Sequence, residues 1–208
     1  CEEKEIELSD KVKAYIACNL ELENMLTYLV NELEKAGIAD DTVICITADH
    51  FPYGLDEDAA VGHMPYLSEL YGYEVMDYFQ RDHNRLILWC GSLEKEEPIT
   101  VDEPVSSIDI LPTLSNLFGT EWDSRLLPGR DVFSEAAPLV FTMSYDWKSD
   151  LGTYYAASGK FVPVSEDTVV PEGYVDKMKV IIRNKRTYMD GLVRNDYFAH
   201  LFGEVQEE

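Results

Sequence analysis

Basic residues are scarce in this sequence: 17 lysines and arginines stand against 40 aspartates and glutamates, so the formal net charge is −23 at pH 7. A surface with this much negative charge repels the phosphate backbone of DNA and RNA, and no run of basic residues offers a footprint for one. We therefore expect no nucleic acid partner. The excess of carboxylates is compatible with a divalent cation but does not predict a metal site, because most acidic residues are simply solvated at the surface.

Cysteines and long apolar segments are also few. The four cysteines form no CxxC pair and no zinc-type spacing, so we expect no structural disulfide. No apolar stretch approaches the roughly 18 residues that a membrane-spanning helix needs. The sequence has neither an initiator methionine nor a signal peptide. We expect a piece of a longer chain in preference to a lipoprotein that begins at Cys1.

What the sequence does contain predicts an α/β fold. Residues 9–37 are amphipathic with helical spacing, with Ser9 or Asp10 as the N-terminal cap and Gly37 as the stop. The runs TVICITA and RLILWCG are apolar without alternation, which is typical of parallel strands covered on both faces. Further helices, a strand PLVFTMS and a hairpin GTYYAASGKFVPV follow. This order favours a mostly parallel sheet with an antiparallel edge hairpin and C-terminal helices.

An acidic residue and a histidine follow the first of these strands. The stretch DDTVICITADHFPYG ends its apolar run at Asp49 and His50. In open α/β sheets, ligands bind beyond the carboxyl ends of the parallel strands, and a carboxylate oxygen with an imidazole nitrogen suits Mn²⁺ or Zn²⁺. Two donors form no closed site, so other ligands would come from elsewhere. In the alternative interpretation, Asp49 caps the next turn and His50 bonds a neighbouring carbonyl.

Four ordered motifs carry a resemblance to a known family. They are LELENMLTYLVNELEKAGIADDTVICITADHFPYG, HNRLILWCGS, VSSIDILPTLSNLFG and DSRLLPGRDVFS. Over about residues 9–145 they resemble the second half of a sulfatase-like catalytic domain of the alkaline phosphatase superfamily, and most of all its lipoteichoic acid synthase and phosphoglycerol transferase branch. The resemblance implies an α/β sandwich around a mixed sheet. Residues 1–208 would then form a single partial domain, the C-terminal part of that catalytic domain.

The resemblance also implies a reaction. Members of this branch are metal-dependent transferases that move glycerol phosphate from a phosphodiester lipid donor to a glycolipid or growing cell-envelope polymer. Their nucleophile is a threonine, activated by a divalent ion that is commonly Mn²⁺, with Mg²⁺, Ca²⁺ or Zn²⁺ as alternatives. An early acid, this threonine and a later Asp-His pair hold the ion, and only the pair is carried over, as Asp49 and His50. We expect the nucleophile and the membrane helices upstream of residue 1, and the isolated chain to be inactive.

Two other histidines are candidates for substrate binding. His63 follows the loop after the metal pair, and His83 precedes the second buried strand. For the full-length protein, the resemblance implies a lipid or glycolipid phosphodiester substrate and a place on the extracytoplasmic face of a bacterial membrane. Removing the N-terminal half of such a domain would expose apolar surface and a sheet edge, so we expect the isolated chain to dimerise.

Two alternative functions stay open. The first is a hydrolase of the same superfamily, such as a sulfatase or phosphodiesterase. A sulfatase would need a cysteine or serine within a C/S-x-P-x-R motif, and none of the four cysteines lies in one. The second is a noncatalytic α/β binding domain in which the end of the strand serves packing alone.

Overall fold

The structure, a computed structural model, describes residues 7–56 and 63–203. The chain divides into two compact units, Cys1–Ile99 and Thr100–Glu208. The expectation of a single partial domain over residues 1–208 therefore stays a prediction.

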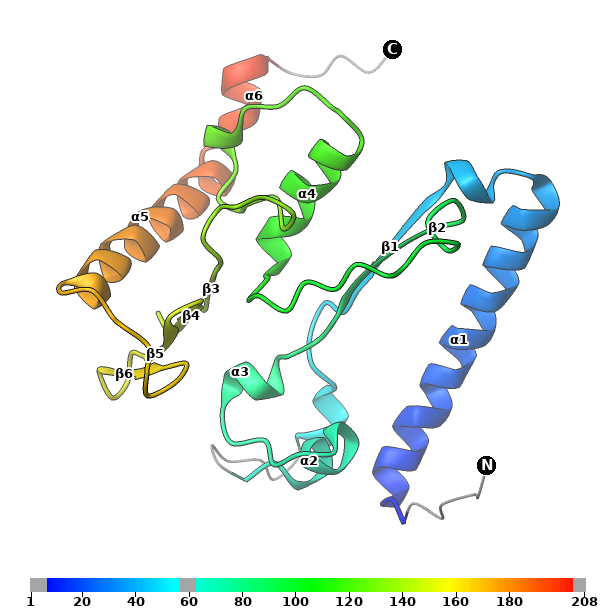
Figure 1. The fold of residues 1–208 in the computed structure, drawn as a ribbon, viewed down its shortest axis with the longest axis horizontal. Coiled ribbons are helices and arrows are strands. Elements are labelled where there is room, and N and C mark those ends of the chain that lie inside the picture. The colour runs from blue at the N-terminus through cyan, green and yellow to red at the C-terminus, as the bar shows by residue number, and fades with distance from the viewer. Residues whose placement is uncertain (1–6, 57–62, 204–208) are drawn as a thin grey trace. The chain divides into compact units, whose positions relative to one another are not determined.

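A long helix opens the first unit. Helix α1 spans Asp10–Ala36 (Figure 1). The Ser9 side chain accepts a hydrogen bond from the Val12 amide at 3.4 Å and caps the helix, and Gly37 ends it in the left-handed region at φ 71°. Both ends lie where the sequence predicted them, because a hydroxyl cap and a glycine stop are local signals. Val12 is completely buried and ties the start of the helix to the core of this unit.

The two predicted strands of this unit are present, but their direction corrects the prediction. Strands β1 (Val43–Thr47) and β2 (Leu86–Cys90) form a two-stranded antiparallel sheet, with Val43 opposite Cys90 and Thr47 opposite Leu86. The expected coverage on both faces is also wrong, because every second residue of β1 is exposed. Short helices precede and connect the two strands: η1 (Ala39–Asp41), η2 (Tyr53–Leu55), α2 (Pro65–Tyr71) and α3 (Tyr78–Arg81).

The core of the first unit lies beside the loop that follows β1. Its buried members come from α1, η2, α2 and the segments next to α2: Val12, Leu55, Met64, Leu67 and Val75. Phe51 packs against this cluster. Because Phe51 directly follows His50, the loop after β1 is anchored to the core at the point where the candidate metal ligands lie.

The second unit contains a sheet and a helix that packs against it. The chain first forms η3 (Ser107–Asp109), α4 (Ile110–Leu117) and η4 (Ser124–Leu126). A four-stranded antiparallel sheet follows in the order β3 (Leu139–Phe141), β4 (Trp147–Ser149), β5 (Gly152–Tyr155) and β6 (Lys160–Pro163). Helices α5 (Tyr174–Arg194) and α6 (Tyr197–Phe202) end the described chain. The predicted hairpin and C-terminal helices are thus present.

Aromatic residues join this sheet to α5. Trp147 on β4 is opposite Tyr154 on β5, and their rings stack with centroids 5.5 Å apart. Met178 and Ile182 of α5 are buried in the same cluster. The fold is therefore mixed α/β with two antiparallel sheets, and the mostly parallel sheet predicted from the apolar runs does not occur among the described strands.

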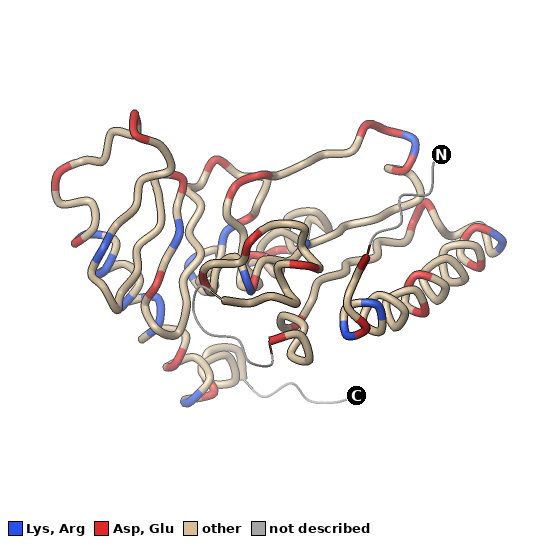
Figure 2. Tube along the Cα trace, turned by 90° about the horizontal axis from the view of Figure 1, so that it is seen from below, with Lys and Arg blue, Asp and Glu red and all other residues tan. Residues whose placement is uncertain are grey.

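Charge is distributed unevenly along the chain. Acidic residues occur throughout both units, whereas six of the 17 basic residues lie in α5 beside only two acids (Figure 2). Among the helices of the described residues, none is long and apolar enough to cross a membrane.

Candidate functional site

Strand β1 delivers Asp49 and His50 to one end of the two-stranded sheet. The last pair of residues in the ladder at this end is Thr47 opposite Leu86. Asp49 follows Thr47 by two residues, and His50 comes next. Five residue pairs set the register of β1 against β2, from Val43 opposite Cys90 to Thr47 opposite Leu86. The position of the pair is therefore fixed by the end of a strand and by the neighbouring core residue Phe51.

The two side chains face each other across a short gap. Asp49 Oδ1 lies 3.4 Å from His50 Nε2, and the side chains are 88% and 42% exposed, respectively. The other ring nitrogen, His50 Nδ1, lies 2.6 Å from the Phe51 carbonyl oxygen. A carbonyl oxygen only accepts hydrogen bonds, so Nδ1 carries the proton. In the neutral imidazole, Nε2 then carries a lone pair and lies 3.4 Å from a carboxylate oxygen.

This arrangement fits a cation. A carboxylate oxygen and an unprotonated imidazole nitrogen repel unless a positive charge lies between them, and either a proton on Nε2 or a metal ion bound to both atoms supplies that charge. Ligand bonds of roughly 2.0–2.2 Å in a tetrahedral arrangement place two donor atoms about 3.4 Å apart, which is the separation of Oδ1 and Nε2. A metal-binding histidine usually donates its second N–H to a carbonyl or carboxylate, as His50 does to Phe51. The alternative interpretation of the sequence had His50 bonding a neighbouring carbonyl, and this bond is present. The same bond orients the ring so that Nε2 is free to act as a ligand.

The pair supplies only part of a coordination sphere. Within residues 7–56 and 63–203, no group of three or more histidine, cysteine, aspartate or glutamate side chains is placed to hold a metal ion. The described residues thus provide one carboxylate and one imidazole. Any further ligands would come from other chain segments, from substrate or from water.

Aromatic side chains hold the imidazole in place, and sequence reasoning did not find them. The Tyr53 ring stacks on His50 with centroids 3.8 Å apart and planes 4° apart, and Phe51 meets Tyr53 edge-on at 4.8 Å. The Arg81 guanidinium lies over the Phe51 ring at 3.9 Å. The aromatic spacing in HFPYG was the available signal for Tyr53, whereas Arg81 is 30 positions further along and has no local signal.

Arg81 brings a cation next to the aromatic support of the site. Its guanidinium makes two hydrogen bonds to the Asp82 carboxylate, from Nε at 2.6 Å and from Nη2 at 3.2 Å, and it also lies 4.5 Å from the Tyr78 ring. These contacts make Arg81 a structural clamp on Phe51. They leave its charge largely compensated by Asp82.

The two histidines predicted to bind substrate lie in different surroundings. His83 is exposed between α3 and β2, and the antiparallel register brings it to the end of the sheet where β1 delivers Asp49 and His50. His63 is exposed and directly precedes Met64, the N-cap of α2. No described contact joins His63 to the metal pair. A substrate-binding role for either histidine stays a prediction.

Comparison with known proteins places the chain in a family context. The family model described as Sulfatase matches residues 1–120. A lipoteichoic acid synthase of Staphylococcus saprophyticus is 34% identical over 125 residues, which cover 60% of this chain and 18% of that protein. A lipoteichoic acid synthase of Staphylococcus aureus is 31% identical over 124 residues, with the same two coverages. The matched part of the chain thus spans less than a fifth of the curated relatives.

Proposed function

This chain belongs to the sulfatase family, and from that premise we propose that it is the C-terminal portion of a metal-dependent phosphoglycerol transferase. The proposed enzyme acts on phosphodiester lipid donors in the synthesis of a cell-envelope polymer. The similarity to lipoteichoic acid synthases supports a transferase of this kind at the level of the family. The identities of the lipid donor, of the acceptor and of the metal ion are likewise proposed.

One observation supports the metal dependence: His50 Nε2 lies 3.4 Å from Asp49 Oδ1 while Nδ1 is held by the Phe51 carbonyl. Mn²⁺ is the ion we propose, with Mg²⁺, Ca²⁺ or Zn²⁺ as alternatives, because one carboxylate and one imidazole form a mixed O/N donor set. Asp49 would supply negative charge and His50 a neutral nitrogen. When bound, the ion would lower the pKa of an attacking hydroxyl and offset charge on the phosphoryl oxygens.

The chain's own residues have distinct parts in this proposal. The Phe51 carbonyl fixes the tautomer of His50, and Tyr53 covers one face of the imidazole and limits its rotation. His83 precedes the first residue of β2 by three positions, at the end of the sheet where β1 delivers the pair, which supports a contact with substrate. The nucleophile would come from outside these 208 residues, because Thr47 lies within β1 and two positions before Asp49. Alone, the chain would be inactive.

The setting of the reaction follows from the relatives and is likewise proposed. A lipid or glycolipid phosphodiester as substrate implies that the full-length enzyme works at a membrane surface. We place it on the extracytoplasmic face of a bacterial membrane, where envelope polymers are assembled.

The metal ligands are tested by paramagnetic broadening. Mn²⁺ added to the chain should broaden the ring resonances of His50 at lower concentrations than those of His200, an exposed histidine on α6. Asp49→Asn should remove this difference. The matched control Asp41→Asn changes an exposed acid in η1 and should leave it intact. Equal broadening of His50 and His200 would argue for the noncatalytic α/β binding domain.

The reaction is tested on the full-length protein. Asp49→Asn should reduce glycerol phosphate transfer from phosphatidylglycerol about hundredfold or more, since a metal ion stabilises such a transition state by several kcal/mol. Asp41→Asn should have little effect. A full-length enzyme that passes glycerol phosphate only to water, and never to a glycolipid or polymer, would favour the hydrolase alternative.

A further inference from the structure

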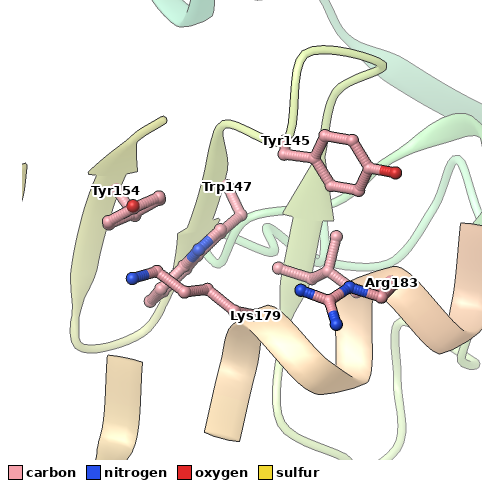
Figure 3. A pocket seen from close by; sticks show the side chains of 6 residues that line it. Tyr145, Trp147, Tyr154, Lys179 and Arg183 are labelled. Carbon is pink, nitrogen blue, oxygen red and sulfur yellow. The ribbon is translucent and has the colours of Figure 1, made fainter. Parts of the chain in front are cut away.

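A second site lies in the C-terminal unit, between the four-stranded sheet and α5. It is a pocket of about 360 Å³ whose lining combines aromatic and basic side chains (Figure 3): Tyr145, Trp147, Tyr154, Lys179, Ile182 and Arg183. All six residues belong to Thr100–Glu208. The pocket shares no residue with the Asp49–His50 pair.

The floor of the pocket contains a hydrogen-bond donor that is not satisfied. Trp147 is 0% exposed, and among the described residues its indole Nε1–H has no hydrogen-bond partner. A buried donor without a partner loses its hydrogen bonds to water and gains none in return, so such groups are rare in native proteins. The indole N–H of Trp147 is therefore suited to donate to a ligand that enters the pocket.

Two cations flank this floor from one side of α5. Lys179 and Arg183 are four residues apart, about one helical turn, so both side chains project from the same face of the helix (Figure 3). Lys179 Nζ lies 4.9 Å from the centre of the Tyr154 ring and 3.5 Å from the Asp176 carboxylate. Arg183 is exposed and makes no ion pair within the described part of the chain.

Tyr145 is held in a strained conformation at the edge of the pocket. Its φ of 68° lies in the left-handed region, where the Cβ of a residue other than glycine comes too close to the following carbonyl oxygen. The Arg186 guanidinium packs on the Tyr145 ring at 4.1 Å. This contact holds the ring as one wall, and such strain is commonest where a binding surface needs it.

The charge around the pocket is opposite to that of the chain. The net charge of the whole chain is −23, yet α5 carries six basic residues and only two acidic ones. Interaction with Tyr154, and then the Asp176 carboxylate, raises the pKa of Lys179, so this side chain stays cationic at neutral pH. An anion is thus attracted to this helix even though most of the molecule repels it.

We propose that this pocket binds an organic phosphate. The phosphate oxygens would accept from Lys179, Arg183 and the Trp147 indole N–H, since a tetrahedral oxyanion accepts donors from several directions at once. Its polyol or sugar body would lie on the rings of Tyr145 and Tyr154. The choice of a glycerol phosphate as the test ligand rests on the proposed function, whereas the oxyanion site rests on the pocket alone.

The test is an NMR titration of the 208-residue chain with sn-glycerol 3-phosphate, with glycerol as the neutral control. The Trp147 indole N–H resonance should shift and saturate with the phosphate and stay unchanged with glycerol. Lys179→Gln and Arg183→Gln should each weaken the affinity about tenfold, because each removes a charge-assisted hydrogen bond to the phosphate. Lys177→Gln, an exposed cation of α5 outside the lining, should have less than a twofold effect. Asp176→Asn should tighten binding by removing the carboxylate that competes for Lys179.

Other results would overturn the proposal. An indole resonance that does not move would exclude the site, and an equal loss in Lys177→Gln would indicate diffuse attraction to α5. Inorganic phosphate binding as tightly as the ester would overturn the assignment of an organic phosphate. Saturable binding here, together with nonselective Mn²⁺ broadening at His50, would support this site while contradicting the proposed metal centre. The reverse pair of results would contradict this site alone.

Discussion

The Tyr53 ring lies flat on the imidazole of His50, with centroids 3.8 Å apart and an angle of 4° between the planes. This stacking, with the bond from Nδ1 to the Phe51 carbonyl, leaves His50 one orientation, in which Nε2 faces Asp49. We predict that Tyr53→Ala lowers the Mn²⁺ affinity of the pair about tenfold, as is usual when a ligand loses its outer support. The measurement is Mn²⁺ broadening of the His50 ring resonances.

Tyr53→Phe is the matched control, because it keeps the ring and removes only the hydroxyl. It should retain the affinity of the unmodified chain. If Tyr53→Phe weakened Mn²⁺ binding as much as Tyr53→Ala, the hydroxyl and not the stacking would be the important group, and the positioning role of the ring would be wrong.

Sequence patterns located the strands but not their direction. The run TVICITA shows that β1 is apolar on both faces, and nothing in it specifies which way its neighbour runs. The direction depends on the path of the chain between β1 and β2, where α2 and α3 return it to the end of the sheet that it left. That path is set by packing between distant residues, such as Val12 with the cluster around Leu67. Capping signals at Ser9 and Gly37 are local, and they predicted the ends of α1 correctly.

The candidate site also contains some residues that a local sequence pattern predicts and others that depend on contacts between distant parts of the chain. Asp49 and His50 could be predicted because adjacent residues at the end of a strand are a sequence pattern. The clamp by Arg81 on Phe51 could not, because it joins residues 30 positions apart. The pocket in the second unit likewise depends on pairing Trp147 with Tyr154 across two strands and on packing both against α5.

Gly129 lies where a side chain would collide with backbone. A Cβ at this position would be 2.0 Å from the Ile108 carbonyl oxygen and 2.9 Å from the Asp109 amide nitrogen. The next residue, Arg130, donates its amide to Asp109 Oδ1 at 2.8 Å, so the segment cannot move away without losing this bond to a buried carboxylate. We predict that Gly129→Ala lowers the free energy of unfolding by about 3 kcal/mol.

Gly191, unlike Gly129, has room for a side chain. It lies inside α5 with nothing closer than 3.9 Å to an added Cβ, so Gly191→Ala should stabilise the chain by about 0.8 kcal/mol through helix propensity. Urea unfolding in a Trp89→Phe background reports on the second unit, since Trp122 and Trp147 are then the remaining tryptophans. Equal stability of the two alanine variants would contradict the close approach at Gly129.

The Arg125–Asp123 pair predicts an acid titration. Arg125 Nε donates to Asp123 Oδ1 at 2.9 Å, and this side-chain bond is the main reason why the pKa of Asp123 falls to about 2. A lowered pKa in the folded state contributes stability above the unfolded pKa of roughly 3.9, and this contribution is lost as pH falls toward 2. Because the pair lies at the surface, solvent screens it, so we expect a shifted titration without a measurable change in melting temperature.

Arg125→Gln should return the pKa of Asp123 toward its ordinary value, as measured by the chemical shift of the Asp123 side-chain carboxyl between pH 1.5 and 6. Arg194→Gln breaks a different surface pair, with Asp190 on α5, and should leave Asp123 unchanged. An Asp123 carboxyl that titrates near 4 in the unmodified chain would contradict the hydrogen bond.

Exposed apolar side chains in the first unit predict self-association. Leu20, Met25 and Tyr28 of α1 are 51%, 48% and 67% exposed, and Ile87 of β2 is 51% exposed. Exposed apolar surface favours association, while a net charge of −23 opposes it. We predict that the isolated chain dimerises, and that added salt strengthens the dimer by screening this repulsion. Light scattering at 50 and 500 mM NaCl measures both effects.

Two surface variants separate the apolar contribution from the electrostatic one. Met25→Glu places a charge within the exposed face of α1 and should weaken the dimer at both salt concentrations. Val193→Glu changes a residue of α5 that is 84% exposed and adds the same charge outside that face, so it should weaken the dimer mainly at 50 mM NaCl. A monomer at high protein concentration in 500 mM NaCl would contradict the prediction. At this salt concentration the charge repulsion is largely screened, so the exposed apolar surface would then be too small to hold a dimer together.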